Sequence, residues 1–220
     1  MNSRNVIRIV LDSALALTLV AVMATALVQE APHEWLGVAL IALTLAHMVF
    51  NRRWLASMFR GRQSALRVVQ IVVIAGLVVC VVGQIASSLV ISKHAFGFLP
   101  VLPGASWARR VHMLCSYWMF VLAFAHVGLH VRAPRDLASW QVWALRIAFA
   151  AIACFGVYSF VRLNLGAYLT GQVQYAFVDP SVPIALSCAR YASVAVLVAG
   201  AFHYLRLGCM RAAKRGCQQP

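Results

Sequence analysis

An all-α integral membrane protein is the fold class that this sequence predicts, and three observations predict it. The chain has 220 residues, of which 63% are hydrophobic and only 11% are charged, whereas soluble domains carry about 25% charged residues. Apolar stretches of about 20 residues, the length that crosses a bilayer as a helix, recur from one end to the other. Few residues remain outside them. We therefore expect a single membrane domain, a bundle of six transmembrane helices, and no soluble catalytic or nucleotide-binding domain.

The six expected spans cover residues 6–28, 32–50, 68–90, 110–131, 142–161 and 183–205. The apolar run of span 6–28 is longer than the core of a cleaved signal peptide, about 7–15 residues, so we expect it to be retained. Pro32 and Pro183 fall in the first turns of their spans, where a helix tolerates proline. Polar or Gly- and Pro-rich connections separate the spans, and residues 206–220 are expected to form a basic cytoplasmic tail.

The chain is strongly basic, with 19 Lys and Arg residues and a net charge of +14. These residues are divided among short connections between apolar spans, which is typical of topology signals and argues against a nucleic-acid partner. Fourteen of the 19 fall on the side that holds both termini. Because Lys- and Arg-rich loops stay cytoplasmic, we expect a multi-pass protein of the bacterial inner membrane with both termini in the cytoplasm. Spans 32–50, 110–131 and 183–205 then run from outside to inside.

The six cysteines form no CxxC or CxxCH motif, which argues against covalent attachment of a c-type haem. Four of them, Cys80, Cys115, Cys154 and Cys188, fall inside apolar spans. There we expect them to act as small apolar side chains.

Two spans carry histidines at an identical spacing. His33 and His47 are 14 residues apart in span 32–50, and His112 and His126 are 14 residues apart in span 110–131. Fourteen residues of helix rise about 21 Å, and in a left-handed bundle they make four turns that return to the same face. Since both spans run in the same direction, His33 can face His112 near the outer surface and His47 can face His126 near the inner surface.

Two such pairs are what two haem groups with six-coordinate iron require, one imidazole on each side of the porphyrin. The alternative is that the histidines make polar contacts between helices. Ionisable residues inside a membrane are costly and a functional role is the default expectation, so the repeated spacing favours haem. Zinc and copper sites need ligands clustered at one depth, which the 14-residue separation disfavours.

The histidines lie in short segments that can be compared with known proteins: HEWLG at 33–37, AHM at 46–48 with NRRW at 51–54, RVH at 110–112 and AHVGLH at 125–130. Together these segments resemble the flavinylation-associated cytochrome family, which is akin to cytochrome b561 and the ferric-reductase-like membrane cytochromes. The resemblance is strongest over residues 7–132. It implies a six-span cytochrome with two b-type haems that moves electrons across a bacterial inner membrane, with an extracytoplasmic partner that carries covalent flavin.

Arginines and glycines near the histidines are candidate cofactor contacts. Arg109 and Arg110 precede His112 and are expected to meet the propionates of the outer haem, while Arg52 and Arg53 follow His47 and are candidates for the inner one. The alternative for these arginines is interface anchoring. Gly37, one turn after His33, and Gly128, two residues after His126, would let a porphyrin approach, or would allow close helix packing.

Five further polar side chains keep more than one interpretation. His130 is an alternative to His126 as the inner ligand, and His203 is either a polar contact or, with His130, part of a quinone site. Asp12 pairs with Arg8 one turn earlier or accepts protons near a quinone. Glu34 tunes the outer haem or faces water, and Arg190 snorkels outward or reaches a propionate. These alternatives are left open by the sequence.

The sequence therefore predicts transmembrane electron transfer by a b-type cytochrome with two haems, between the quinone pool and an extracytoplasmic partner that carries flavin or a metal. Without a flavin or nicotinamide domain, a quinol or a partner protein must supply the electrons, and whether the chain is itself an enzyme, a quinol dehydrogenase, is left open. One alternative is the membrane anchor of a larger oxidoreductase, such as a molybdoenzyme or ferric reductase. Others are a haem-free transporter and a carrier or sensor with one labile haem.

Overall fold

The computed structural model describes residues 3–25, 30–58, 60, 64–98, 100, 103–131, 137–176 and 181–216. Within these residues the chain is helical and contains no strand. Its helices are α1 (Ser3–Thr25), α2 (Glu30–Ser57), α3 (Ala65–Ile91), α4 (Ala105–His130), α5 (Ser139–Arg162), α6 (Leu165–Leu169) and α7 (Ile184–Gly216). All except the five-residue α6 are long and apolar enough to cross a membrane. The predicted fold class, an all-α membrane protein with six spans, is confirmed.

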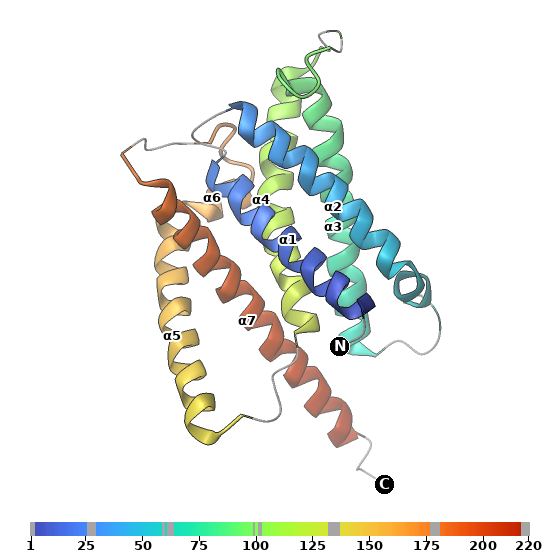
Figure 1. Ribbon diagram of the computed structural model, residues 1–220, viewed down its shortest axis with the longest axis vertical. Helices are drawn as coiled ribbons and strands as arrows, with labels where there is room; N and C mark the ends of the chain where they lie inside the picture. The colour runs from blue at the N-terminus through green and yellow to red at the C-terminus, as the bar shows by residue number, and fades with distance from the viewer. Residues whose placement is uncertain are drawn as a thin grey trace.

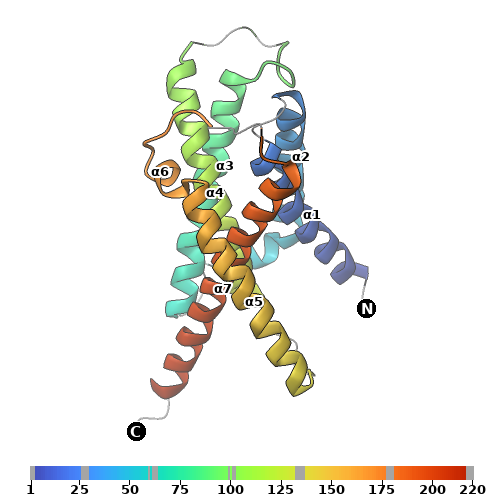
Figure 2. The same ribbon diagram turned by 90° about the vertical axis from the view of Figure 1, so that its left-hand side faces the viewer.

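Helix α4 lies in the middle of the bundle (Figures 1 and 2). It packs along α3 on one side and α7 on the other, while α5 packs on α7 and α1 packs on α2 and α7. The main core joins buried side chains of α1, α2, α4, α6 and α7, with Phe120 and Val194 fully buried. The outward faces of the long helices remain apolar, for example at Leu17 and Val79. Such faces suit contact with lipid.

Small residues allow the closest helix crossings. A Cβ atom at Gly128 of α4 would overlap the carbonyl oxygen of Ala199 in α7. At Gly156 of α5 it would lie 2.6 Å from the carbonyl oxygen of Ser193, also in α7. Because lipid gives no hydrophobic drive for helices to associate, van der Waals contact between closely packed backbones has to hold them together.

Two helices continue well past the predicted spans, and one short helix was not predicted. Helix α2 continues to Ser57 and α7 continues to Gly216, so residues 206–216 extend the last span as helix. Polar and basic residues such as Arg and Lys are good helix formers, so a transmembrane helix continues past the apolar limit that hydropathy detects. Helix α6 was not predicted. It is too short to show a period, and it begins after Asn164, which has a left-handed backbone conformation with φ 50°.

Candidate functional site

The four spaced histidines lie in two pairs between α2 and α4. The ring centroids of His33 and His112 are 6.2 Å apart with an angle of 68° between the ring planes. Those of His47 and His126 are 6.4 Å apart with an angle of 80°. Both helices run downward in Figure 1. The structure thus brings His33 beside His112 and His47 beside His126, at two levels of the bundle, as the sequence predicts.

The separation of the rings is wider than a direct hydrogen bond between them would give. Ring atoms of an imidazole lie about 1.15 Å from its centroid, given bonds of about 1.35 Å. Two rings joined in line by an N–H···N bond of about 2.9 Å would have centroids about 5.2 Å apart. Two rings that share one metal ion, with metal–nitrogen distances of about 2.0 Å, would have centroids about 6.3 Å apart. Both observed centroid distances match the second arrangement, and with their angles of 68° and 80° they also lie within the range of an edge-to-face contact between two rings, about 4.5–7 Å.

A cavity of about 470 Å³ separates α2 from α4 at the His33–His112 level. Its volume is in the range of pockets that hold small molecules and cofactors, about 300–1,000 Å³. Both histidines line it, together with Gly37 and Thr44 of α2 and Met113 of α4. A Cβ atom built on Gly37 would meet nothing within 4 Å, so the missing side chain adds to the free space beside His33.

Helix α1 engages both histidines of α2. The Nδ1 atom of His33 lies 3.3 Å from the carbonyl oxygen of Val22, and Nδ1 of His47 lies 2.8 Å from Oδ1 of Asp12. Because a carbonyl and a carboxylate oxygen accept hydrogen bonds, each ring donates its Nδ1–H, and in the neutral ring Nε2 is then the nitrogen that could bind a ligand. Such second contacts are what orient histidines that bind metals.

Helix α3 makes the corresponding contact with His112. The Nδ1 atom of His112 lies 3.3 Å from Oγ of Ser88 and 3.5 Å from Oγ of Ser87. The Ser87 hydroxyl donates to the carbonyl oxygen of Gly83 at 2.7 Å, so toward His112 its oxygen is an acceptor. The fourth ring differs, since Nδ1 of His126 is buried without a hydrogen-bond partner in the described part of the chain. A buried polar atom without a partner is unusual, and a group bound at Nε2 of this ring would leave Nδ1 without one.

Of the two candidate inner ligands on α4, His126 is the one opposite His47. The ring of His130 lies 4.4 Å from that of His126 and 5.3 Å from that of Trp54, and its Nδ1 lies 2.9 Å from the carbonyl oxygen of His126. His130 is exposed. This geometry favours His126 over His130 as the partner of His47.

The two arginines before His112 have different surroundings. Arg109 lines the cavity, and its guanidinium lies 5.6 Å from the centroid of the Tyr175 ring. Arg110 donates two hydrogen bonds of 3.1 Å to the side-chain oxygen of Gln174, with that amide oriented toward it. Arg109 therefore lies at the cavity, whereas the side chain of Arg110 is bound to Gln174 in the connection between α6 and α7.

Two other candidate residues lie away from the pairs. Arg53 is exposed near the end of α2, and no contact of its side chain with His47 or His126 is seen among the described residues. Gly128 packs against α7, as described above, so its small size serves helix packing. Of the two candidate glycines, Gly37 is the one that borders the cavity at His33 and His112.

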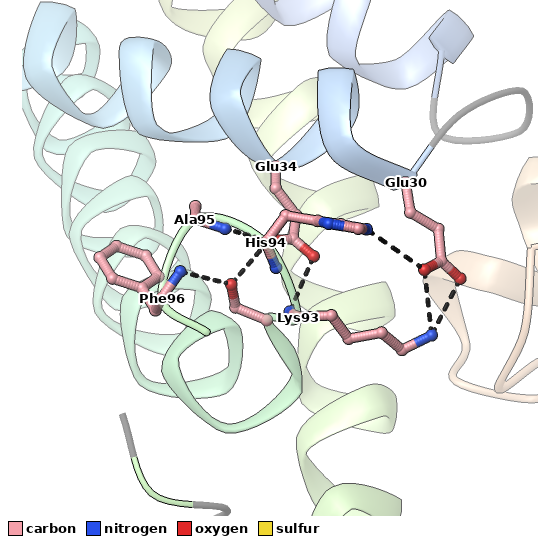
Figure 3. Close-up of polar contacts among 7 residues, drawn as sticks. Glu30, Glu34, Lys93, His94, Ala95 and Phe96 are labelled. Carbon is pink, nitrogen blue, oxygen red and sulfur yellow. Dashed lines mark hydrogen bonds and ion pairs between the residues drawn. The ribbon is translucent and has the colours of Figure 1, made fainter. Parts of the chain in front are cut away.

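The carboxylate of Glu34 binds the segment that follows α3 (Figure 3). It accepts hydrogen bonds from the Ser92 hydroxyl at 2.6 Å and from the backbone amides of Lys93, His94 and Ala95 at 3.0, 2.9 and 2.8 Å. Lys93, Ala95 and Phe96 line the cavity. Glu34 is half-buried, and through these four hydrogen bonds its carboxylate holds one wall of the cavity in place.

The remaining polar candidates, His203 and Arg190, differ in their surroundings. Nδ1 of His203 lies 3.2 Å from the carbonyl oxygen of Val131, which also accepts a 2.7 Å hydrogen bond from Arg206. The polar-contact interpretation of His203 thus fits its position. The Nε atom of Arg190 is buried and has no hydrogen-bond partner among the described residues.

Sequence reasoning missed three groups near the pairs: Ser87, Ser88 and Trp54. The serines lie 24 and 25 residues before His112 on another helix, so no local spacing marks them. Trp54 ends the NRRW segment and was given no role at the pairs, yet its ring centroid lies 6.5 Å from that of His126. It also lines a second cavity of about 260 Å³ between the end of α2 and the start of α3, together with Ser57, Ser64, Arg67 and Gln70.

No family of known proteins, curated protein or solved structure matches this chain. Within the described residues, no three His, Cys, Asp or Glu side chains lie close enough together to hold a metal ion by themselves. A metal ion at either histidine pair would thus take its other ligands from a bound group. A porphyrin supplies four nitrogen ligands in one plane and leaves two axial positions, so the donor set fits haem.

Proposed function

We propose that this chain is a membrane cytochrome with two b-type haems that carries electrons across the bilayer. The observation that carries the proposal is the separation of the paired rings, 6.2 and 6.4 Å, at two levels of α2 and α4. His33 and His112 would hold one iron, and His47 and His126 the other. Ligation by two imidazoles leaves no open position on the iron, which favours one-electron transfer over oxygen chemistry.

The surroundings of each pair support this assignment. Arg109 at the cavity would pair with a haem propionate, because a guanidinium suits a carboxylate. The open space at Gly37 would admit the porphyrin beside His33. The two levels are separated by 14 residues of helix, a rise of about 21 Å, so the pair of sites would span much of the roughly 30 Å apolar layer.

The orientation and partners also belong to this proposal. The excess of Lys and Arg at the end that holds both termini supports a cytoplasmic location for that end, and we propose that the protein lies in a bacterial inner membrane. The His47–His126 pair is then on the inner side. We propose the quinone pool as one redox partner and an extracytoplasmic protein carrying flavin or a metal as the other. The cavity beside Trp54 offers polar groups next to apolar walls, which would suit a quinone head group.

The test is haem stoichiometry in the purified chain. The protein is expressed in cells supplied with haem, purified in detergent and assayed by pyridine haemochrome, and its reduced-minus-oxidised spectrum is recorded. We expect two b-type haems per chain, both low-spin in both redox states. Absence of haem from the folded, helical chain would overturn the proposal and favour a haem-free transporter.

Single substitutions test which histidine pair binds which haem. His33→Ala and His112→Ala should each remove one haem, and His47→Ala and His126→Ala should each remove the other. His203→Ala is the matched control, since His203 binds a backbone carbonyl of Val131 and should leave both haems in place. Loss of a haem on changing His203, with none lost on changing His33, would contradict the assignment. Co-purification with a stable redox subunit would identify the chain as the membrane anchor of a larger oxidoreductase.

A further inference from the structure

The two histidines of α2 contact hydrogen-bond acceptors of different charge on helix α1. His33 meets the neutral carbonyl of Val22 at 3.3 Å, whereas His47 meets the carboxylate of Asp12 at 2.8 Å. His112 faces serine hydroxyls, and Nδ1 of His126 has no partner in the described chain. Among these four rings, His47 is therefore the one that bonds to a charged acceptor.

The neighbours of Asp12 do not compete for its contact with His47. Arg8, one turn earlier on α1, donates to the carbonyl oxygen of Phe50 at 3.4 Å, so the expected pairing of Arg8 with Asp12 is replaced. The Asn51 amide donates to the carbonyl oxygen of His47 at 3.0 Å and lies 3.4–3.5 Å from its ring nitrogens. An acidic residue within a membrane span is costly unless it is paired, and the N–H of His47 provides that pairing.

We infer that Asp12 is a positioning residue that orients His47 and makes the redox centre at His47–His126 the one with the lower reduction potential. The inference rests on the proposed function. A carboxylate that accepts the Nδ1–H of a ligating histidine raises the basicity of the ring. Its negative charge also stabilises the oxidised, more positive form of the centre more than the reduced form.

Two basic and two acidic side chains line the cavity at the other pair, and Arg109 is the basic one that makes no ion pair among the described residues. Arg109 lines the cavity at His33 and His112, and a positive charge there stabilises the reduced form. Glu34 lines the same cavity, but its carboxylate is bound by four donors of residues 92–95, which disperse its charge. The carboxylate of Asp12 beside His47 and the guanidinium of Arg109 beside the other pair both make the His47–His126 centre the easier one to oxidise. With that pair on the cytoplasmic side, electrons would pass downhill from the inner centre to the outer one; each transfer would remove one electron from the inner centre, oxidising it, and add that electron to the outer centre, reducing it.

The experiment measures the potential of one centre at a time. His33→Ala removes the outer haem, so the remaining haem reports the inner centre, and the same protein with Asp12→Asn tests the carboxylate. Asparagine keeps a similar shape and removes the charge. We expect the midpoint potential to rise by about 59 mV or more, a tenfold change in a one-electron equilibrium constant, in line with the effect of second contacts on metal sites. The g values of the ferric low-spin EPR signal should change as well.

Two further variants complete the test. Glu30→Gln in the same background removes an exposed carboxylate that pairs with Lys93 at 3.0 Å, and should leave the potential unchanged. If Asp12→Asn lowers haem content, Asp12→Glu should restore both the haem and the low potential. An unchanged potential in Asp12→Asn, an equal shift in Glu30→Gln, or a wild-type inner centre of higher potential than the outer one would overturn the inference. Only a wild-type chain without haem would overturn the proposed function as well.

Discussion

Glu34 of α2 and Ser92, which follows α3, are joined by a 2.6 Å hydrogen bond between residues 58 positions apart in the chain. Together with three backbone amides, this contact ties the start of α2 to the segment that forms one wall of the cavity (Figure 3). Nearby Glu30 makes only exposed ion pairs, with Lys93 at 3.0 Å and His94 at 3.8 Å. Two acidic residues one turn apart thus have very different roles.

Glu34→Ala is expected to destabilise the protein by at least about 2 kcal/mol, because each hydrogen bond to a charged group contributes about 1.5–3 kcal/mol. Glu30→Ala should cost about 0–1 kcal/mol, as exposed ion pairs do. Thermal unfolding in detergent measures the difference, and hydrogen exchange of residues 92–98 should rise in the Glu34 variant alone. Equal effects of the two substitutions would contradict the distinct roles.

Gly37→Leu is expected to expel the haem at the His33–His112 pair while the other haem stays. The leucine would fill space that is open beside His33, so the chain should fold and the cofactor should lose its place. Haem content and the visible spectrum measure the loss. Gly208→Leu is the matched control, since a Cβ at Gly208 of α7 also meets nothing within 4 Å and is far from the pairs in sequence. Two haems in Gly37→Leu would show that the cavity is not the porphyrin site.

Gly128→Ala is expected to weaken the whole bundle by about 1–3 kcal/mol, as overpacking of a tight contact does. The added Cβ would overlap the carbonyl oxygen of Ala199 and force α4 away from α7. Thermal unfolding in detergent measures the effect. Gly166→Ala in α6, where a Cβ meets nothing within 4 Å, should leave the unfolding temperature close to that of the unmodified protein. A stable Gly128→Ala variant would mean that α4 and α7 are not in close contact.

Arg109→Gln is expected to lower the potential of the haem at His33–His112, because it removes a positive charge from the cavity wall. Arg110→Gln should change that potential much less, since Arg110 is bound to Gln174. Redox titration of the His47→Ala protein, in which only the outer haem remains, separates the two cases. A larger effect for Arg110 would reverse the roles that the structure gives these neighbours.

The candidate site was predictable where its pattern lies along a single helix. The 14-residue spacing of His33 and His47, and of His112 and His126, defines one face on each span through helical geometry alone. The contacts of Ser88 and Trp54 were not predictable, because each reaches a histidine on another helix and leaves no spacing in the chain.

The sequence by itself determined the six spans and the two matched histidine faces, because apolar length and helical period are local properties of the chain. The tertiary structure decided which neighbour meets each face. In it, Gly37 borders a cavity, Gly128 packs against another helix, and Asp12 contacts His47 rather than Arg8. The physical reason is that these outcomes depend on how α1, α3 and α7 pack around α2 and α4, and side-chain contacts between helices are set by that packing rather than by position along any one of them.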